Sequence, residues 1–475
     1  MGCRQRHRYP SAILLSALLA SLSASTAAAL GFPACVQDAL RQNPAMLLAR
    51  AKMAEARGQA SSAEGRLLPR LSGSFSAIQS NNPLTVLGMK LSQRSATFND
   101  FGAGAFSGPA TLGTAPGNLD HPHAYHNLGT QLQLAIPIWD GGAVRSGIYE
   151  TRAMLRAARS GNILARQQLV FSLLEAYDGV IAARSQVRVA LKDRSADAAS
   201  VKTTEQLFRR GVVLRSDLLA ARVHAEEAGL GVQQARNALA NALDNLEILI
   251  GWNRPVPPSV GKPVLPEMPS GNIAALEKEG LFRNPGIRAL QQKVLAARAG
   301  VAMARASYMP HVNGVVKQEW NGTSLGNGAP SYTLGGQITW DALDFSRGGQ
   351  VDAAHAKVEE LLARLRQAQD RLRLQIAEAA RAARVAAHQA RIRELALEQS
   401  REAQRLLRLR YENGIETLTG LLQGQAELDH ARSAVVEARY EEAVRRGALL
   451  FALGRMELAD MPAPARSAGS AGEQS

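Results

Sequence analysis

The placement of proline constrains this chain more than any other feature of its sequence. The chain has 20 prolines in 475 residues, yet none falls between 138 and 254 or between 331 and 461. Because a proline costs about 3 kcal/mol inside a helix, these gaps are where long helices can form. A glycine-containing turn interrupts each gap, at Gly211 and Gly414. Each gap therefore predicts two long helices, expected at 143–208, 216–250, 347–411 and 418–453. At a rise of about 1.5 Å per residue, helices of this length predict an extended molecule.

The predicted long helices carry an apolar repeat of seven residues. Spacings of three and four alternate along Leu218, Ala221, Ala225, Ala228, Val232, Ala235, Leu239, Ala242, Leu246 and Leu249. The same rhythm runs through Val358, Leu361, Leu365, Ala368 and Leu372. This spacing is typical of a coiled-coil seam, and its alanines permit close helix approach. An ordinary helical bundle is the alternative that the seam by itself leaves open.

The chain contains two copies of one unit. Leu40–Pro44 returns as Leu281–Pro285, and later landmarks return in the same order. The units are expected at 34–252 and 272–455. Residues 253–271 between them are rich in proline and predict a stiff, extended linker. Residues 456–475 are small and polar, and predict a disordered tail.

The first 29 residues are typical of a secretory signal peptide. Three arginines precede a short apolar stretch, and Ala27–Ala29 offers small residues for cleavage. A membrane anchor is the alternative, although the apolar stretch is short for a spanning helix. Cys3 lies in this segment, which leaves Cys35 without an intrachain partner and excludes a disulfide framework. Cys35 is then either unmodified or a site of lipid attachment.

Each unit also holds two runs of about ten residues in which apolar and polar side chains alternate. These runs are expected as strands near 71–80, 127–138, 311–320 and 332–343. Their length and alternation are typical of membrane barrel strands with one lipid-facing and one water-facing side. The side chains expected to line the pore are Gln131, Gln133, Gln337 and Thr339. Four strands cannot close a barrel, for which about eight is the smallest number, whereas three copies of the chain supply twelve. A soluble four-stranded sheet is the alternative.

The ordered set of these landmarks resembles the TolC-like outer membrane factors over nearly all of residues 34–455. The resemblance rests on the duplicated Asn-Pro helix starts and on the helix–proline–strand junctions at Pro69 and Pro310. It also rests on the entry Trp139–Gly142 into a long helix, and on the turns Arg210–Leu219 and Tyr411–Leu422. It implies a mainly α-helical chain with a small β part. Such chains form a homotrimer with a twelve-stranded β-barrel in the outer membrane and a long coiled-coil helical tunnel in the periplasm. The implied partners are a periplasmic adaptor (membrane fusion protein) and an inner-membrane RND or ABC transporter.

The two helix–helix turns are the expected periplasmic tip of that tunnel. The candidate adaptor contacts are Arg210, Gly211, Asn413 and Gly414, and both glycines are expected in the left-handed conformation that ends a helix. TolC-like channels often carry aspartates at the positions held here by Gly420 and Gln423, whose absence predicts weak cation selectivity. Asp217 is expected to cap its helix or also to pair with Tyr411 and hold the entrance shut. The candidate gate residues are Asp217, Tyr411, Glu416, Gly420 and Gln423.

No constellation for covalent chemistry is recognisable. The sequence has no phosphate-binding loop with lysine, no Cys or His pair at metal spacing on a helix, and no nucleophile elbow. We therefore expect no enzymatic activity, no cofactor and no structural metal. The histidines of His121–His126 lie in a long loop, where a metal site is the alternative to a solvated surface. The net charge of +14 is spread among acids rather than gathered in a patch, which disfavours nucleic acid.

The expected function is that of a passive export duct in the outer membrane, within a tripartite efflux or type I secretion system. The alternative is a periplasmic helical scaffold or adaptor without a pore. That alternative explains the coiled-coil helices but gives the alternating strands no role.

Overall fold

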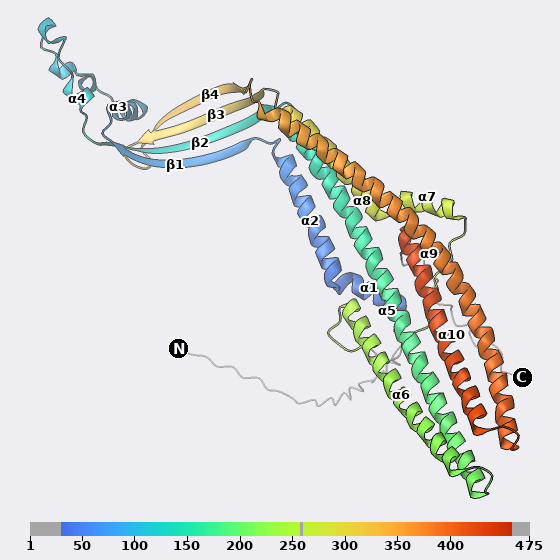
Figure 1. Ribbon diagram of the computed structural model, residues 1–475. Coiled ribbons are helices and arrows are strands. Elements are labelled where there is room, and N and C mark those ends of the chain that lie inside the picture. Colours follow the sequence, from blue (N-terminus) through green and yellow to red (C-terminus); the bar gives the residue numbers. More distant parts are fainter. Residues whose placement is uncertain (1–29, 257–259, 458–475) are drawn as a thin grey trace, which may run out of the picture.

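The computed structural model describes residues 30–256 and 260–457, and the molecule is elongated (Figure 1). The strands lie together at one end, and the helices continue away from them to two helix–helix turns at the other end. The expected signal peptide at 1–29 lies outside the described residues. So do residues 257–259 of the expected linker and residues 458–475 of the expected tail.

Four long helices form the body of the molecule. They are α5 (Ala143–Arg209) and α9 (Ser346–Glu412), of 67 residues each, and α6 (Arg215–Ile250) and α10 (Leu418–Leu453), of 36 residues each. α5 pairs with α6, α9 pairs with α10, and α10 also packs on α5. The seven-residue apolar positions of α6 and α9 are buried or half-buried, which confirms the predicted seam. Across the described part of the chain, no helix combines the length and the apolar character needed to cross a membrane.

Each repeat starts with two shorter helices that meet at an Asn-Pro pair. These are α1 (Phe32–Gln42) and α2 (Pro44–Gly65) in the first repeat, and α7 (Ile273–Arg283) and α8 (Pro285–Ala306) in the second. α2 and α8 pack on α5, and α8 also packs on α9. The second helix of each pair then leads into the first strand of its repeat.

The asparagine of each Asn-Pro pair joins three helices. The side chain of Asn43 accepts a hydrogen bond from the Ala45 N–H and donates one to the Leu249 carbonyl, both at 2.8 Å. Asn284 makes the equivalent bonds with the Gly286 N–H at 2.9 Å and the Ala452 carbonyl at 3.1 Å. Each amide therefore caps the start of one helix and satisfies a carbonyl at the end of another. Proline is tolerated at the first helical position because its missing N–H needs no partner there.

The strands form one antiparallel sheet in the order β1-β2-β3-β4. They are β1 (Arg70–Ser80), β2 (Tyr125–Trp139), β3 (His311–Gly322) and β4 (Ala329–Thr339). The prediction that the fourth strand continues to 343 is wrong. After Thr339 the chain turns into α9, and the turn is held by Arg347, whose side chain lies near Asp341 and Asp344 at 3.5 and 3.6 Å.

The apolar core lies where the short helices meet the long ones. One cluster centres on Leu173, Tyr177 and Leu246 of the first repeat, and a second on Ile376, Leu449 and Leu453 of the second repeat. Val256 and Val260 of the proline-rich linker are buried in the first cluster. Met456 is also buried there, with 0% exposure. The prediction of disorder from 456 onward is therefore wrong at its first residue, because an apolar side chain that follows the last helix is still within reach of the core.

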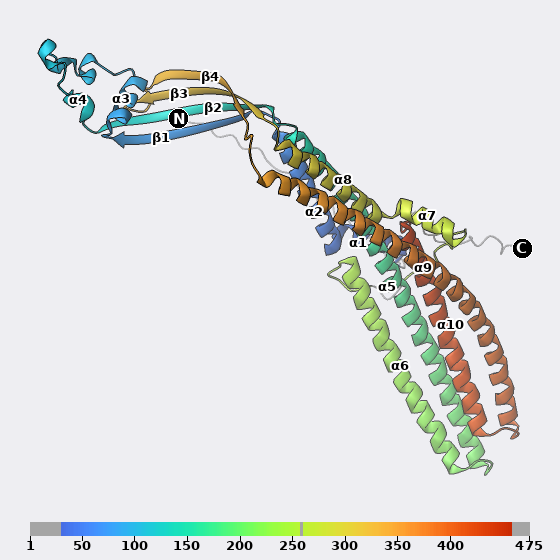
Figure 2. The same cartoon turned by 45° about the horizontal axis from the view of Figure 1, so that its top comes forward.

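Residues 81–124 join β1 to β2 and extend beyond the sheet, away from the helices (Figures 1 and 2). They contain α3 (Pro83–Ser92), three short 3-10 turns and α4 (Gly117–Asp120). The corresponding connection between β3 and β4 is the short turn 323–328.

Candidate functional site

The helix–helix turn of each repeat is built around a glycine in the left-handed conformation. Gly211 has a φ of 77° and Gly414 a φ of 73°, as predicted. The next N–H in each turn reaches back to a carbonyl of the descending helix at 2.9 Å, from Val212 to Leu207 and from Ile415 to Arg410. This bond pattern ends a helix by satisfying its last carbonyls. A side-chain carbon added at either glycine meets no atom within 4 Å, so both turns present an open surface.

The predicted contact residues that precede these glycines are placed differently. Arg210 is exposed at the end of α5. Asn413 is also exposed, and its side-chain amide donates to the Leu409 carbonyl at 2.7 Å. Arg210 is thus an exposed charged group at the first turn, next to the exposed Arg209, whereas Asn413 partly closes its own helix end.

The starts of the two ascending helices are capped by different groups. The Asp217 carboxylate accepts the Leu214 N–H at 3.1 Å at the start of α6. The Thr417 hydroxyl accepts the Gly420 N–H at 3.1 Å at the start of α10, and Glu416 accepts the Thr417 N–H at 3.0 Å. Asp217 therefore caps its helix, as one of the two sequence hypotheses held.

Tyr411 does not pair with Asp217. Its side chain is buried, with 3% exposure, and its hydroxyl lies 3.2 Å from that of Thr204 on α5. The expected Asp217–Tyr411 contact is wrong within this chain because Asp217 is engaged at its own helix start. A small apolar cluster surrounds the tyrosine and joins the two hairpins, formed by Ala221, Leu418 and Leu421 with Val201, Leu207 and Leu422. Sequence reasoning missed Thr204, since one threonine in a long polar helix gives no distinguishing signal.

The remaining gate candidates lie on α10. Gly420 is half-buried, and a carbon added there would come within 2.5 Å of the Glu416 carboxylate oxygen. Gln423 is exposed and lines a shallow hollow with Glu427, His430 and Arg393. The sequence therefore provides one carboxylate beside Gly420, from Glu416, and none at positions 420 and 423 themselves.

Above the turns, an ionic cluster that sequence reasoning missed joins the two hairpins. Arg432 on α10 lies 2.9 Å from both Asp193 on α5 and Asp429 on α10. Gln425 donates to Asp429 at 3.0 Å and accepts from Gln404 of α9 at 3.0 Å. Burial, followed by the neighbouring Asp429, raises the pKa of Asp193 to about 7. Asp429 and Arg432 each follow an apolar residue, Leu428 and Ala431, by one position, but no spacing in the sequence links them to Asp193.

The sheet separates polar from apolar side chains along its whole width. Directly paired residues of adjacent strands share a face, and Ser72, Gln133, Lys317 and Thr333 form one cross-strand row. Ser74, Gln131, Glu319 and Ser331 form the next row on that face. Gln131 donates to Gln133 at 3.1 Å. Gln337 and Thr339 lie on the same face by register, so all four predicted pore-lining residues are on one side.

The opposite face of the sheet is apolar and uncovered. Leu71, Leu134, Val316 and Leu334 form a row across all four strands. Leu71 is 68% exposed, Leu334 76% and Ile338 70%. Large apolar side chains exposed along a sheet face indicate a surface that is covered by an apolar partner or environment when the protein functions.

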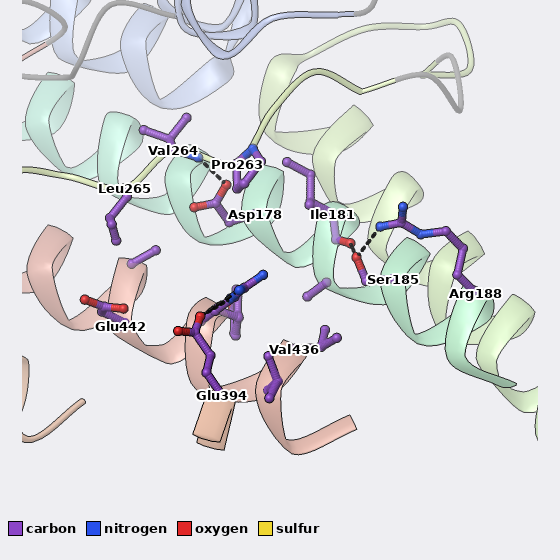
Figure 3. Close-up of a pocket in the computed structure, with 15 residues that line it drawn as sticks. Asp178, Ile181, Ser185, Arg188, Pro263, Val264, Leu265, Glu394, Val436 and Glu442 are labelled. Atoms are coloured by element: carbon purple, nitrogen blue, oxygen red, sulfur yellow. Dashed lines mark hydrogen bonds and ion pairs between the residues drawn. The ribbon is translucent and has the colours of Figure 1, made fainter. Parts of the chain in front are cut away.

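A cavity of about 460 Å³ lies between α5, α9, α10 and the linker (Figure 3). Asp178 on α5 accepts the Val264 N–H at 3.0 Å and so fastens the linker to the helix. Burial raises the pKa of Asp178 to about 7. Arg439 and Glu394 form an ion pair at 2.6 Å beside the cavity. No group of three or more potential metal ligands occurs among the residues that the structure describes.

The profile of the family described as "Outer membrane efflux protein" matches residues 35–252 and 277–455. Protein CyaE of Bordetella pertussis is 28% identical over 68% of this chain and 70% of its own length. Alkaline protease secretion protein AprF of Pseudomonas aeruginosa is 26% identical over 42% of each chain. Toluene efflux pump outer membrane protein TtgC of Pseudomonas putida is 25% identical over 54% of this chain and 57% of its own length. This chain thus spans less than two thirds of the last two relatives.

Two solved structures have the same fold as this chain. CusC superposes with a TM-score of 0.75 at 17% identity, over 89% of this chain and 92% of that one. The outer membrane protein VceC from Vibrio cholerae superposes with a TM-score of 0.71 at 18% identity, over 89% and 96%. The long helical body and its small sheet are therefore the architecture of these proteins, which confirms the predicted fold class.

Proposed function

This chain belongs to the outer membrane efflux protein family, and we propose that three copies of it form a passive export duct. Family membership confirms the resemblance seen in the sequence, and the protein is an outer-membrane channel component that extends into the periplasm. The duct itself does no covalent chemistry in this proposal, and its partners supply the energy for transport.

The two-faced open sheet is the observation that carries the trimer. β1 and β4 are edge strands whose outer backbone groups have no partner within the described chain, and such edges call for further strands. Since four strands are too few for a closed barrel, three chains that pair β1 with the partner's β4 would supply twelve. The row of Leu71 and Leu334 would then face lipid, and the row of Gln133 and Lys317 would face water.

The other end of the molecule carries the proposed docking surface. In this proposal a periplasmic adaptor packs on the turns at Gly211 and Gly414, and an inner-membrane RND or ABC transporter delivers the cargo. Two observations support it: both turns are open to solvent, and Arg210 projects from the first. The relatives named above include an alkaline protease secretion protein and a toluene efflux pump outer membrane protein, so the proposal keeps both kinds of transporter.

The scaffold alternative is the weaker proposal. A periplasmic scaffold has no use for a sheet whose apolar face exposes leucines on β1, β2 and β4 (Leu71, Leu132 and Leu334), and the family match favours the channel.

Cysteine labelling of the reconstituted protein tests the proposal. Cysteines at Gln131, Gln133 and Gln337 should react with a small charged thiol reagent, and cysteines at Leu132, Leu134 and Ile338 should not. Native mass spectrometry in mild detergent should show three chains. A monomer that is stable in plain buffer, or the reverse labelling pattern, would contradict the proposal. The native Cys35 does not interfere, because it is fully buried and burial raises its thiol pKa to about 12.

A further inference from the structure

Residues 81–124 differ from every other part of the duplicated chain, because the second repeat replaces them with the turn 323–328. Both views place α3 at the ends of the strands that lie farthest from the helices (Figures 1 and 2). The segment is folded against the sheet rather than free of it, since Val86 and Met89 of α3 are buried, with 3% and 7% exposure.

Its contacts identify the face of the sheet on which α3 lies. Gln93, at the end of α3, donates to the Asn127 side chain at 2.9 Å and accepts from the Tyr125 hydroxyl at 2.9 Å. Asn127 in turn donates to the Asn321 side chain at 2.8 Å. Along β2, Tyr125 and Asn127 alternate in step with Gln131 and Gln133, so they point to the polar face. α3 is therefore fastened to the side of the sheet that carries the predicted pore-lining residues.

Further bonds anchor the segment to itself and to a third strand. The Arg94 side chain donates to the Pro330 carbonyl of β4 at 3.0 Å. Lys90 of α3 forms an ion pair with Asp100, and Asp100 accepts the Thr97 N–H at 2.7 Å. The Lys90 ion pair, with the Thr97 bonds, lowers the pKa of Asp100 to about 2. The Asp100 carboxylate thus stays charged over the whole physiological pH range.

The exposed side of α3 carries its two outer leucines, beside the small residues Thr85, Gly88 and Ser92. Leu84 and Leu91, seven residues apart on one helix face, are 83% and 52% exposed. Phe98, Phe106 and Leu112 farther along the segment are 88%, 57% and 77% exposed. The segment has four charged residues in all, two of which are paired with each other.

We propose that residues 81–124 form an apolar constriction inside the outer mouth of the channel. This inference rests on the proposed function, in which the polar face of the sheet is the wall of the pore. Three copies would then bring three apolar helix faces into a mouth whose wall is otherwise polar. An apolar ring resists hydrated ions by dewetting. The exit would therefore disfavour small charged solutes that enter from outside, while apolar cargo leaves.

The test reads entry from the outer side, so that it does not depend on the periplasmic tip. Cells that carry Gln133→Cys are treated from outside with a small charged thiol reagent and with a bulky polyethylene-glycol maleimide. With the segment intact, the small reagent should label slowly and the bulky one not at all. When 83–122 is replaced by a short Gly-Ser turn, both should label, the small one severalfold faster.

A second variant guards against misfolding of the shortened chain. The double change Leu84→Ser and Leu91→Ser alters side chains that are exposed, and it should raise the labelling rate of the small reagent severalfold. The matched control is Leu343→Ser, an equally exposed leucine in the connection between β4 and α9, which should leave the rate unchanged. A rate that is the same with and without Leu84 and Leu91 would overturn the constriction. Absence of any labelling of Gln133→Cys, in all variants, would instead count against a wet polar face and thus against the proposed function.

Discussion

The two repeats have the same backbone plan but different chemistry at their ends. Each starts at an asparagine that joins three helices, and each contains helices of 67 and 36 residues joined by a left-handed glycine. At the outer end, the first repeat has a folded segment where the second has a short turn. At the tip, the first ascending helix is capped by the carboxylate of Asp217 and the second by the hydroxyl of Thr417. Duplication has thus kept the residues that set the backbone and changed those at the outer end of the sheet and at the start of the ascending helices.

The largest effect is expected at the tip glycines, where the two repeats should behave alike. Gly211→Trp and Gly414→Trp each add bulk to an open turn that we propose as the adaptor contact, and each should abolish export without loss of trimer or membrane insertion. Gly211→Ala is the control, since its added carbon meets nothing within 4 Å and adds only about 1 kcal/mol of backbone strain. Normal export from both tryptophan variants would remove the turns from the mechanism.

The asparagine joints should come next, again with equal effects. Asn43→Ala and Asn284→Ala each remove a helix cap, which costs about 1 kcal/mol, and leave a carbonyl without its partner, which costs about 1–3 kcal/mol. Thermal unfolding of the detergent-solubilised protein should show a lower Tm for both. Asn413→Ala is the matched control, because it removes only the exposed hydrogen bond from the Asn413 side-chain amide to the Leu409 carbonyl. It should lower the Tm less. A large loss in one repeat only would show that the joints are not equivalent.

The ionic cluster between the hairpins should give a pH dependence. Five charged or titratable groups face one another there. They are Asp193 and Asp197 on α5, Asp429 and Arg432 on α10, and His224 on α6 beside Asp197. Folding raises the pKa of Asp193 to about 7, so the protonated carboxyl adds to the free energy of unfolding. This contribution is complete below the unfolded pKa of about 3.9 and is lost as pH rises through about 7. The wild-type Tm should therefore fall as pH rises from about 4 to about 7 and level off above about pH 8.

Asp193→Asn should flatten that fall, since an amide cannot ionise beside Asp429. Asp178 in the first repeat also has a raised pKa of about 7, so part of the slope should persist until Asp178→Asn is added. The exposed Asp352→Asn is the control that should leave the slope unchanged. An undiminished slope in the double variant would show that neither buried aspartate causes it.

The smallest effect is expected from single polar contacts at the tip, where the repeats should differ. Tyr411→Phe removes a buried hydrogen bond between the hairpins, worth about 1 kcal/mol, and should make channel openings in planar bilayers more frequent. Asp217→Ala loses only a cap within one hairpin and should change opening less. Gln423→Ala should leave ion selectivity unchanged. If Asp217→Ala opened the channel more than Tyr411→Phe, the closing contact would lie on the first hairpin instead.

The sequence by itself determined the plan of this molecule, because the features that set it are local. Proline-free stretches, Asn-Pro pairs and turn glycines act through the backbone of their own neighbourhood, so they predicted the long helices, the duplication and both turns. The period of two in residues such as Gln131 and Gln133 predicted the strands and the face of each side chain, since alternation is a property of the extended chain.

Only the tertiary structure decided which polar groups meet across elements. Thr204 and Tyr411 are 207 residues apart in the chain, and the choice of Thr204 over Asp217 depends on how α9, which carries Tyr411, lies against α5 and α6. Likewise, α3 lies on the polar face because Gln93 forms hydrogen bonds with β2. The spacing of residues in the sequence does not predict these bonds. Contacts of this kind depend on how whole helices pack against one another. The same pattern of apolar residues is compatible with several packing arrangements, each of which would bring different polar residues together.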